Sequence, residues 1–218
     1  MKTILIFFSI CVSISIIHGA NESTCALCDL GETKCSTTCT GKTCVTITQF
    51  NTLLGNFSGT YRGCSESCTP VAFTLTASDN RQIRSSSACC TTEKCNQDLN
   101  LNLPPVSTFE NGAHCPICEK NNQSECKANA HLACRGAEQK CISLEGTAID
   151  GKSNFTFKGC ATESACTLVK DDLMPFKNMI YKLSKNATCT DRGTLAAISS
   201  PMVLIPVFAG FLLGNVLS

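Results

Sequence analysis

The sequence contains no tryptophan, and its aromatic residues are only 11 phenylalanines and 2 tyrosines among 218 residues. This scarcity argues against a large aromatic core. Histidine is also rare, since only His114 and His131 lie beyond the first 20 residues. Positive and negative charges almost cancel, with a formal net charge of +1. The charge balance therefore does not suggest a nucleic acid or an anionic membrane surface as a partner.

Residues with catalytic potential are few. The sequence has no G-x-S-x-G and no H-E-x-x-H motif, and we expect His114 and His131 to lie in solvated loops. Asp171 and Asp172 could be read as a carboxylate pair, but we expect both to be solvated at a hairpin tip. Because no nucleophile, base and orienting group can be named together, we predict no enzyme, no catalytic residue and no cofactor.

Cysteine, in contrast, is abundant. The chain has 19 cysteines, a content typical of a disulfide scaffold. Each half contains a C-x-x-C motif, formed by Cys25 and Cys28 in the first half and by Cys115 and Cys118 in the second. Such a motif could be half of a zinc site or a redox motif. In an exported chain such cysteines are expected to pair, so we predict disulfides and no metal site.

The N-terminal residues have the layout of a secretory signal peptide. Lys2 precedes an apolar run from Ile4 to Ile17, and the small residues Gly19 and Ala20 follow. We therefore predict a signal peptide over residues 1–20. Its removal would take Cys11 and leave 18 cysteines, an even number that allows complete pairing.

The C-terminal residues suggest a lipid anchor. From Leu195 to Ser218 no residue is charged, and no basic flank follows the apolar stretch. We expect residues 192–218 to be a glycosylphosphatidylinositol signal, with Asp191 or Gly193 as the attachment residue. A membrane-spanning helix is the alternative.

Five N-x-[ST] triplets favour an exported, glycosylated chain. We expect this chain to be extracellular, either secreted or anchored at the outer face of the plasma membrane. The predicted glycosylation sites are Asn21, Asn56, Asn122, Asn154 and Asn186.

The remaining 18 cysteines form a duplicated unit. Ten lie between Cys25 and Cys95, and eight between Cys115 and Cys189. Both groups open with C-x-x-C, continue with a cysteine leading an alternating run, and return through a basic residue, a glycine and a cysteine. We place the first domain at residues 21–97, a proline-bearing linker at 98–112 and the second domain at 113–191.

Alternation of apolar and polar residues predicts β-hairpins and no long helix. The strands expected in the first unit are 45–48, 60–64, 71–75 and 82–89. Those expected in the second unit are 141–144, 155–157, 167–169 and 179–183, with residues 171–177 as a short helical turn or an irregular tip. Since units of this size have small cores, we expect disulfides to supply much of the stability.

The first unit resembles the LU domain shared by the urokinase receptor, the lymphocyte antigen 6 proteins and the three-finger toxins. Its ending, Cys89-Cys90-Thr-Thr-Glu-Lys-Cys95-Asn96, carries the C-C-x4-C-N signature of that family. The resemblance implies a small disulfide-rich all-β fold of two tandem three-finger domains. In the first domain it implies the pairs Cys25–Cys44, Cys28–Cys35, Cys39–Cys64, Cys68–Cys89 and Cys90–Cys95.

The second unit lacks the final cysteine pair and resembles the gamma-type phospholipase A2 inhibitors. The resemblance is carried by the stretch from Ala133-Cys134-Arg135-Gly136 to Lys140-Cys141-Ile142, and by Lys158-Gly159-Cys160. By analogy the bridges are Cys115–Cys141, Cys118–Cys126, Cys134–Cys160 and Cys166–Cys189. The apolar C-terminal segment departs from those typically soluble inhibitors.

Binding to another protein is the function that remains. The resemblance implies inhibition of a secreted phospholipase A2 by complex formation. The alternative is an anchored surface receptor or adhesion protein with an unrelated ligand. Apolar residues that a small core cannot easily hide are the candidate contacts. These candidates are Leu53, Leu54, Phe57, Leu101, Leu103, Pro104, Pro105, Val106, Met174 and Phe176. The five that lie in the linker, from Leu101 to Val106, could instead pack between the two domains.

Overall fold

The computed structural model describes residues 22–53, 55–78, 81–121 and 130–191. These residues are almost entirely β-structure, with one short 3-10 helix, η1 (Glu163–Thr167). The predicted signal peptide and the predicted anchor segment lie outside the described residues. The expected class, a disulfide-rich all-β fold of two tandem three-finger units, is confirmed.

The first unit has six strands, β1 (Ser23–Leu27), β2 (Thr37–Gly41), β3 (Thr43–Asn51), β4 (Phe57–Ser65), β5 (Ala72–Ser78) and β6 (Arg81–Cys90). Strands β1 and β2 form a separate two-stranded sheet, while the others lie in the order β5-β6-β3-β4. Alternation in β3 places Val45 and Ile47 in a buried cluster with Tyr61. The four strands expected in this unit are thus observed, and β1 and β2 are additional.

The second unit has seven strands, β7 (Glu110–Asn121), β8 (Ala130–Arg135), β9 (Lys140–Ala148), β10 (Asn154–Ala161), β11 (Leu173–Phe176), β12 (Met179–Leu183) and β13 (Thr188–Asp191). Two expectations for this unit are wrong. Residues 167–169 are not a strand, and residues 171–177 include strand β11, which forms a hairpin with β12. Pro175 weakened the strand pattern in the sequence, but β11 lies at the end of the sheet path, where a proline is tolerated.

Disulfides join strands within each unit. Eight bridges in the described residues match the pairs that the resemblance implies: Cys25–Cys44, Cys28–Cys35, Cys39–Cys64, Cys68–Cys89, Cys90–Cys95, Cys115–Cys141, Cys134–Cys160 and Cys166–Cys189. Cys118 is also disulfide-bonded, and its expected partner, Cys126, lies outside the described residues. No described bridge crosses from one unit to the other.

The first unit is closed by a buried asparagine that follows its last cysteine. The Asn96 side chain is fully buried. Its Nδ2 donates to the carbonyl oxygens of Ala26 and Val45, at 2.9 and 3.2 Å, and its Oδ1 accepts from the amide of Ala26 at 2.9 Å. Because these partners lie on β1 and β3, the Asn96 side chain connects the end of the first unit to both of its sheets.

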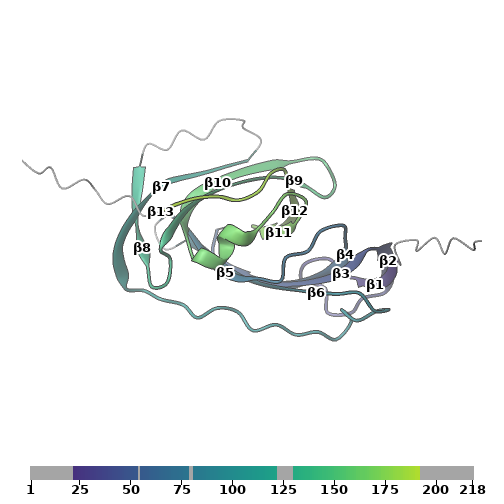
Figure 1. Cartoon of the computed structure of the whole chain (residues 1–218). Helices are drawn as coiled ribbons and strands as arrows, with labels where there is room; N and C mark the ends of the chain where they lie inside the picture. Colours follow the sequence, from purple (N-terminus) through teal and green to yellow (C-terminus); the bar gives the residue numbers. More distant parts are fainter. Residues whose placement is uncertain (1–21, 54, 79–80, 122–129, 192–218) are drawn as a thin grey trace, which may run out of the picture.

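The two units are arranged head to tail. In Figure 1, β1 lies at one end of the molecule and β13 at the other. Strand β5 of the first unit pairs with β10 of the second, with Leu75 opposite Ala161 and Thr76 opposite Cys160. One continuous 11-stranded sheet therefore runs through both units.

A hydrophobic core spans the boundary between the units. Leu75 and Ile83 of the first unit belong to the same buried cluster as Leu144, Phe155 and Phe176 of the second. In the second unit four rings pack together, with the Phe155 ring centroid 4.6 Å from that of Phe176 and 4.9 Å from that of Tyr181. The sequence did not predict this core, because it is built from residues of both units that are distant in the chain.

Polar groups bridge the same boundary. The carboxylate of Asp172 is buried and accepts hydrogen bonds from the hydroxyls of Ser67 at 2.7 Å and Thr69 at 2.5 Å. Gln49 Nε2 donates to the carbonyl of Lys177 at 2.9 Å, and Asn51 Nδ2 donates to the same oxygen. The expectation that Asp172 is solvated at a hairpin tip is wrong, because Asp172 directly precedes β11 and its carboxylate is covered by Ser67 and Thr69 of the first unit.

Candidate protein-binding surface

The linker lies along the first unit as a strap, a name we use for residues 98–109. Figure 1 shows this teal segment running between β6 and β7 beneath the first unit. Three side chains hold its carbonyl groups: Arg62 Nη2 donates to Leu99 at 3.2 Å, Ser86 Oγ to Asn102 at 2.6 Å and Arg84 Nη1 to Pro104 at 2.9 Å. The strap backbone is thereby held in place before any partner binds, which lowers the entropy lost on association.

Apolar side chains on the strap face solvent. Val106 is 50% exposed and Phe109 is 81% exposed. The Phe109 carbonyl accepts a hydrogen bond from the amide of Gly136 at 2.9 Å, so the backbone that carries this ring is attached to the second unit. An exposed ring on a held backbone is typical of an interaction site. Sequence reasoning missed Phe109, although it lies within the predicted linker.

The other predicted contacts on the strap are less exposed. Leu101, Leu103 and Pro104 are half-buried, and Pro105 is exposed. Partial burial of these three residues does not by itself place them between the two domains, so that alternative stays a prediction for them. The candidate surface is centred on Pro105, Val106 and Phe109.

Several predicted contact residues cannot form a surface. Leu53, Met174 and Phe176 are buried in the core that spans the two units, which corrects their assignment as exposed residues. The cause is tertiary, because residues of both units pack around these three side chains in one core. Phe57 is half-buried, and Leu54 lies outside the described residues.

The strap and the two units meet at a cavity of about 350 Å³, which we call the junction cavity. It is lined by Thr76, Gln82, Val106, Ser107, Thr108 and Arg135. A smaller cavity of about 120 Å³ shares most of these residues and reaches Glu138. Strands β5 and β6, the strap and the end of β8 thus contribute to one hollow with a mixed polar and apolar lining.

Glu138 connects the two units beside the junction cavity. Its Oε1 accepts from the Thr76 hydroxyl at 2.7 Å, and its Oε2 accepts from the amide of Arg135 at 3.3 Å. Burial raises the pKa of the Glu138 carboxyl, and the hydrogen bond from Thr76 opposes that rise only in part. The stretch that resembles the gamma-type inhibitors therefore contains one of the residues that join the second unit to the first.

Gly136 permits the close approach of the strap at this junction. Its φ is +52°, and a Cβ there would lie 2.4 Å from the Cβ of Ser107. A larger residue would have to displace the strap, in addition to the strain of a left-handed backbone. The absence of a side chain at Gly136 thus lets the strap lie against the residue that follows Arg135.

The predicted modification sites lie on the surface where they are described. Asn56, Asn154 and Asn186 are exposed, whereas Asn21 and Asn122 lie outside the described residues. Asp191 is exposed and its Oδ1 lies 2.7 Å from Lys140 Nζ, whereas Gly193 lies outside the described residues.

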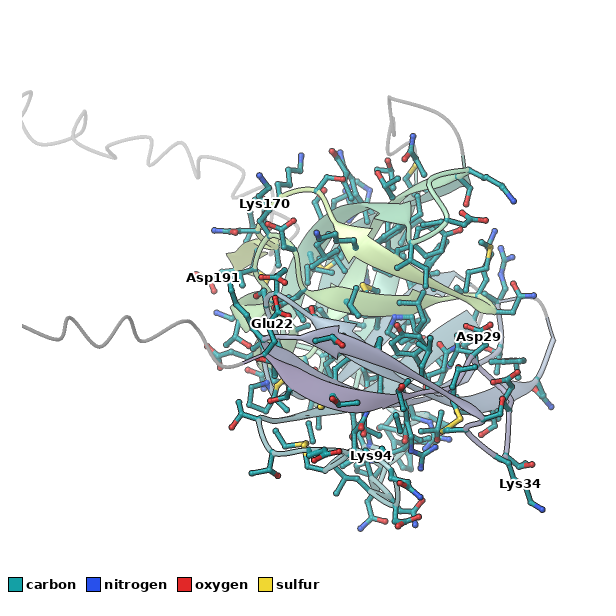
Figure 2. The ribbon with its side chains drawn as sticks, turned by 90° about the vertical axis from the view of Figure 1, so that its right-hand side faces the viewer. Glu22, Asp29, Lys34, Lys94, Lys170 and Asp191 are labelled. Atoms are coloured by element: carbon teal, nitrogen blue, oxygen red, sulfur yellow. A yellow bond between two sulfur atoms is a disulfide. The ribbon has the colours of Figure 1, made fainter. Side chains whose placement is uncertain are left out.

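Figure 2 shows charged side chains such as Lys34 and Lys170 at the periphery of the molecule.

Within the described residues, no helix is long and apolar enough to cross a membrane.

Comparison with known proteins identifies the relatives of the chain. Residues 111–193 match the family described as the u-PAR/Ly-6 domain. The chain is 35% identical over 109 residues to Protein RoBo-1 of Rattus norvegicus, covering 49% of this chain and 44% of that protein. It is 33% identical over 114 residues to a gamma-type phospholipase A2 inhibitor of Gloydius brevicaudus siniticus, covering 50% and 52%.

The urokinase plasminogen activator surface receptor of Bos taurus is 36% identical over 83 residues, covering 36% of this chain and 24% of the receptor. The matched region of the chain spans about half the length of the first relatives. The second unit thus matches the u-PAR/Ly-6 domain family, and the chain is similar over part of its length to a phospholipase A2 inhibitor of the gamma type and to the urokinase receptor.

Proposed function

We propose that this chain is a non-enzymatic extracellular binding protein that inhibits a secreted phospholipase A2 by forming a complex with it. The observation that carries the proposal is the exposed ring of Phe109 on a strap whose backbone is held by both units. Several similar proteins are named phospholipase A2 inhibitors, at 29% to 33% identity.

The proposed inhibition is steric and needs no chemical step. A rigid body that seats the exposed end of the strap on the phospholipase would cover the entrance through which the lipid reaches the active site. Aromatic anchors contribute most to such interfaces when the surrounding contacts exclude water. The shared core and the bridging hydrogen bonds keep the two units from moving apart during binding.

Titration against a panel of secreted phospholipases A2 tests the proposal. We expect a saturable complex and loss of activity with at least one enzyme, and about thirtyfold weaker binding for Phe109→Ala, the effect of losing one anchor residue. Ile149→Ala is the matched control, since Ile149 is 53% exposed in the turn between β9 and β10. Absence of binding to every enzyme in the panel would end the inhibitor proposal.

A second candidate is a lipid-anchored surface receptor or adhesion protein with an unrelated ligand. The uncharged apolar segment from Leu195 to Ser218 and the similarity to the bovine urokinase receptor favour it. Phosphatidylinositol-specific phospholipase C should then release the protein from the surface of expressing cells. Protein that stays on the cells after this treatment would contradict the lipid anchor.

A further inference from the structure

We propose that Asn111 is a deamidation site whose reaction is slowed by the fold and, once complete, loosens the strap. Asn111 lies at the start of β7, just after the strap, and is the one asparagine in the sequence that precedes a glycine. This inference is independent of phospholipase binding. It rests on the hydrogen bonds of the Asn111 side chain and on the chain geometry at Gly112.

The Asn-Gly pair supplies the chemistry. The backbone nitrogen of Gly112 attacks Cγ of Asn111, which closes a succinimide ring and expels Nδ2 as ammonia, and the proton of the Gly112 amide passes through water to the departing nitrogen. Water then opens the ring at either carbonyl group and leaves aspartate or isoaspartate. Glycine favours the attack because it has no Cβ that crowds the nitrogen. Water is the only co-reactant.

The chain is irregular and open at this position. The ladder between β7 and β8 shifts register between Glu110 and His114, so Asn111 and Gly112 lie in a bulge. Gly112 is exposed, its φ is +79°, and a Cβ there would meet no described atom within 4 Å apart from its chain neighbours. The bulge therefore leaves room for a succinimide ring beside the backbone.

Three hydrogen bonds restrain the Asn111 side chain. Its Nδ2 donates to the carbonyl oxygens of Gly136 and Glu138, both at 2.9 Å, and its Oδ1 accepts from the amide of Ala113 at 3.0 Å. Ring closure makes Cγ tetrahedral and turns Nδ2 away from its two acceptors, so the bonds to the turn at residues 136–138 must open first. The reaction therefore proceeds from a minor open state, and its rate follows the population of that state.

The product cannot restore these contacts. A carboxylate has only acceptor oxygens, so at position 111 it would leave the carbonyl groups of Gly136 and Glu138 without their donor. The Gly136 amide also donates to the carbonyl of Phe109 at 2.9 Å, so the same turn holds the end of the strap. Deamidation thus loosens the strap, and the loss of ammonia makes the change irreversible.

Mass spectrometry of the full chain, kept at neutral pH and body temperature, tests the proposal. Deamidation replaces an amino group by a hydroxyl group and raises the mass of the peptide that contains Asn111, and enzymatic methylation detects isoaspartate. A synthetic peptide of residues 108–114 gives the rate without the fold. We expect the product in the folded chain to form about tenfold more slowly than in the peptide, or slower still. Equal rates, or no product in the folded chain, would overturn the proposal.

Thr76→Val tests the restraint on the reaction. The Thr76 hydroxyl donates to Glu138 Oε1 at 2.7 Å, so its loss should free the turn and speed deamidation about fivefold, the effect of one hydrogen bond. Thr48→Val is the matched control, because the Thr48 hydroxyl lies 3.1 Å from that of Thr60, within the first unit, and it should leave the rate unchanged. Equal rates in the two folded variants would contradict a reaction that depends on the turn.

Asn111→Asp tests the effect of the product, and it serves as the test if Thr76→Val does not fold. Hydrogen exchange of the Gly136 amide should become about tenfold faster, because the carbonyl groups of the turn lose their donors. Asn102→Asp adds the same charge at an exposed position of the strap and should not change exchange at Gly136. Unchanged exchange at Gly136 in Asn111→Asp would show that the modification does not loosen the strap, and the proposal would fail.

Discussion

The two three-finger units are closed by different interactions. The first unit ends with the Cys90–Cys95 bridge and with Asn96, whose side chain reaches β1 and β3 of the same unit. The second unit has no such pair in its sequence, and its chain returns through β13, which pairs with β9. In place of the missing closure it has an aromatic cluster that packs against residues of the first unit.

The comparison shows that one fold can be stabilised locally or through a neighbour. Both units contain disulfides between their own cysteines, and the first unit adds the Cys90–Cys95 bridge and the buried side chain of Asn96. The rings of the second unit are buried partly by Leu75 and Ile83 of the first unit, so the second unit depends on its neighbour. We therefore expect the second unit to lose its structure when the boundary between the units is weakened.

The largest expected effect comes from the aromatic cluster. Phe155→Ala should lower the free energy of unfolding by about 3–5 kcal/mol, because it leaves a cavity among tightly packed rings. Urea denaturation measures this loss. Phe109→Ala, which removes an exposed ring, is the control and should change the free energy by less than about 0.5 kcal/mol. Equal effects from the two substitutions would contradict the described core.

The next effect should come from the closure of the first unit. Asn96→Ala leaves the amide of Ala26 and several carbonyl oxygens without their partner, and should cost about 2–4 kcal/mol. Asn102→Ala, at an exposed position on the strap, is the matched control. Hydrogen exchange would show which strands lose protection. Loss confined to the second unit would refute the view that Asn96 closes the first.

A smaller effect is expected at the polar boundary between the units. Asp172→Asn keeps the shape of the side chain but cannot accept all the hydrogen bonds that now come from Ser67, Thr69 and the amide of Val169. We expect a loss of about 1–3 kcal/mol in thermal or urea unfolding. Asp171→Asn is the control, because Asp171 is more exposed and forms a surface ion pair with Lys182. A loss as large for Asp171→Asn would show that the boundary is not the cause.

The smallest effect concerns the pH dependence of Glu138. Burial raises the pKa of its carboxyl in the folded state, so the folded protein binds this proton more tightly than the unfolded chain. The stability contributed by the protonated form is fully present below the ordinary pKa of glutamate and is lost as the pH rises through the folded pKa. Glu138→Gln should therefore gain stability relative to the native chain over that pH window. If the free energies of unfolding of the two proteins, measured in urea, change with pH in the same way, this prediction is contradicted.

Local patterns were sufficient for much of the fold. Alternation located strands β3 to β6, β9, β10 and β12, because side chains in a half-buried strand alternate between two faces. Strands β1, β2, β7, β8 and β13 were not predicted, since cysteines and polar residues interrupt the apolar alternation in them and their pairing comes from partners elsewhere in the chain. Residues 171–177 escaped for the same reason, since β11 is a strand only by pairing with β12.

The sequence by itself determined the duplicated cysteine pattern, the linker between the repeats and, through its resemblance to a known family, the pairs that the bridges join. Only the tertiary structure decided which residues are hidden. Leu53, Met174, Phe176 and Asp172 are buried because residues far away in the chain cover them, and Phe109 is exposed because nothing does. Burial is a property of contacts between distant segments, and a periodic pattern within one segment does not encode those contacts.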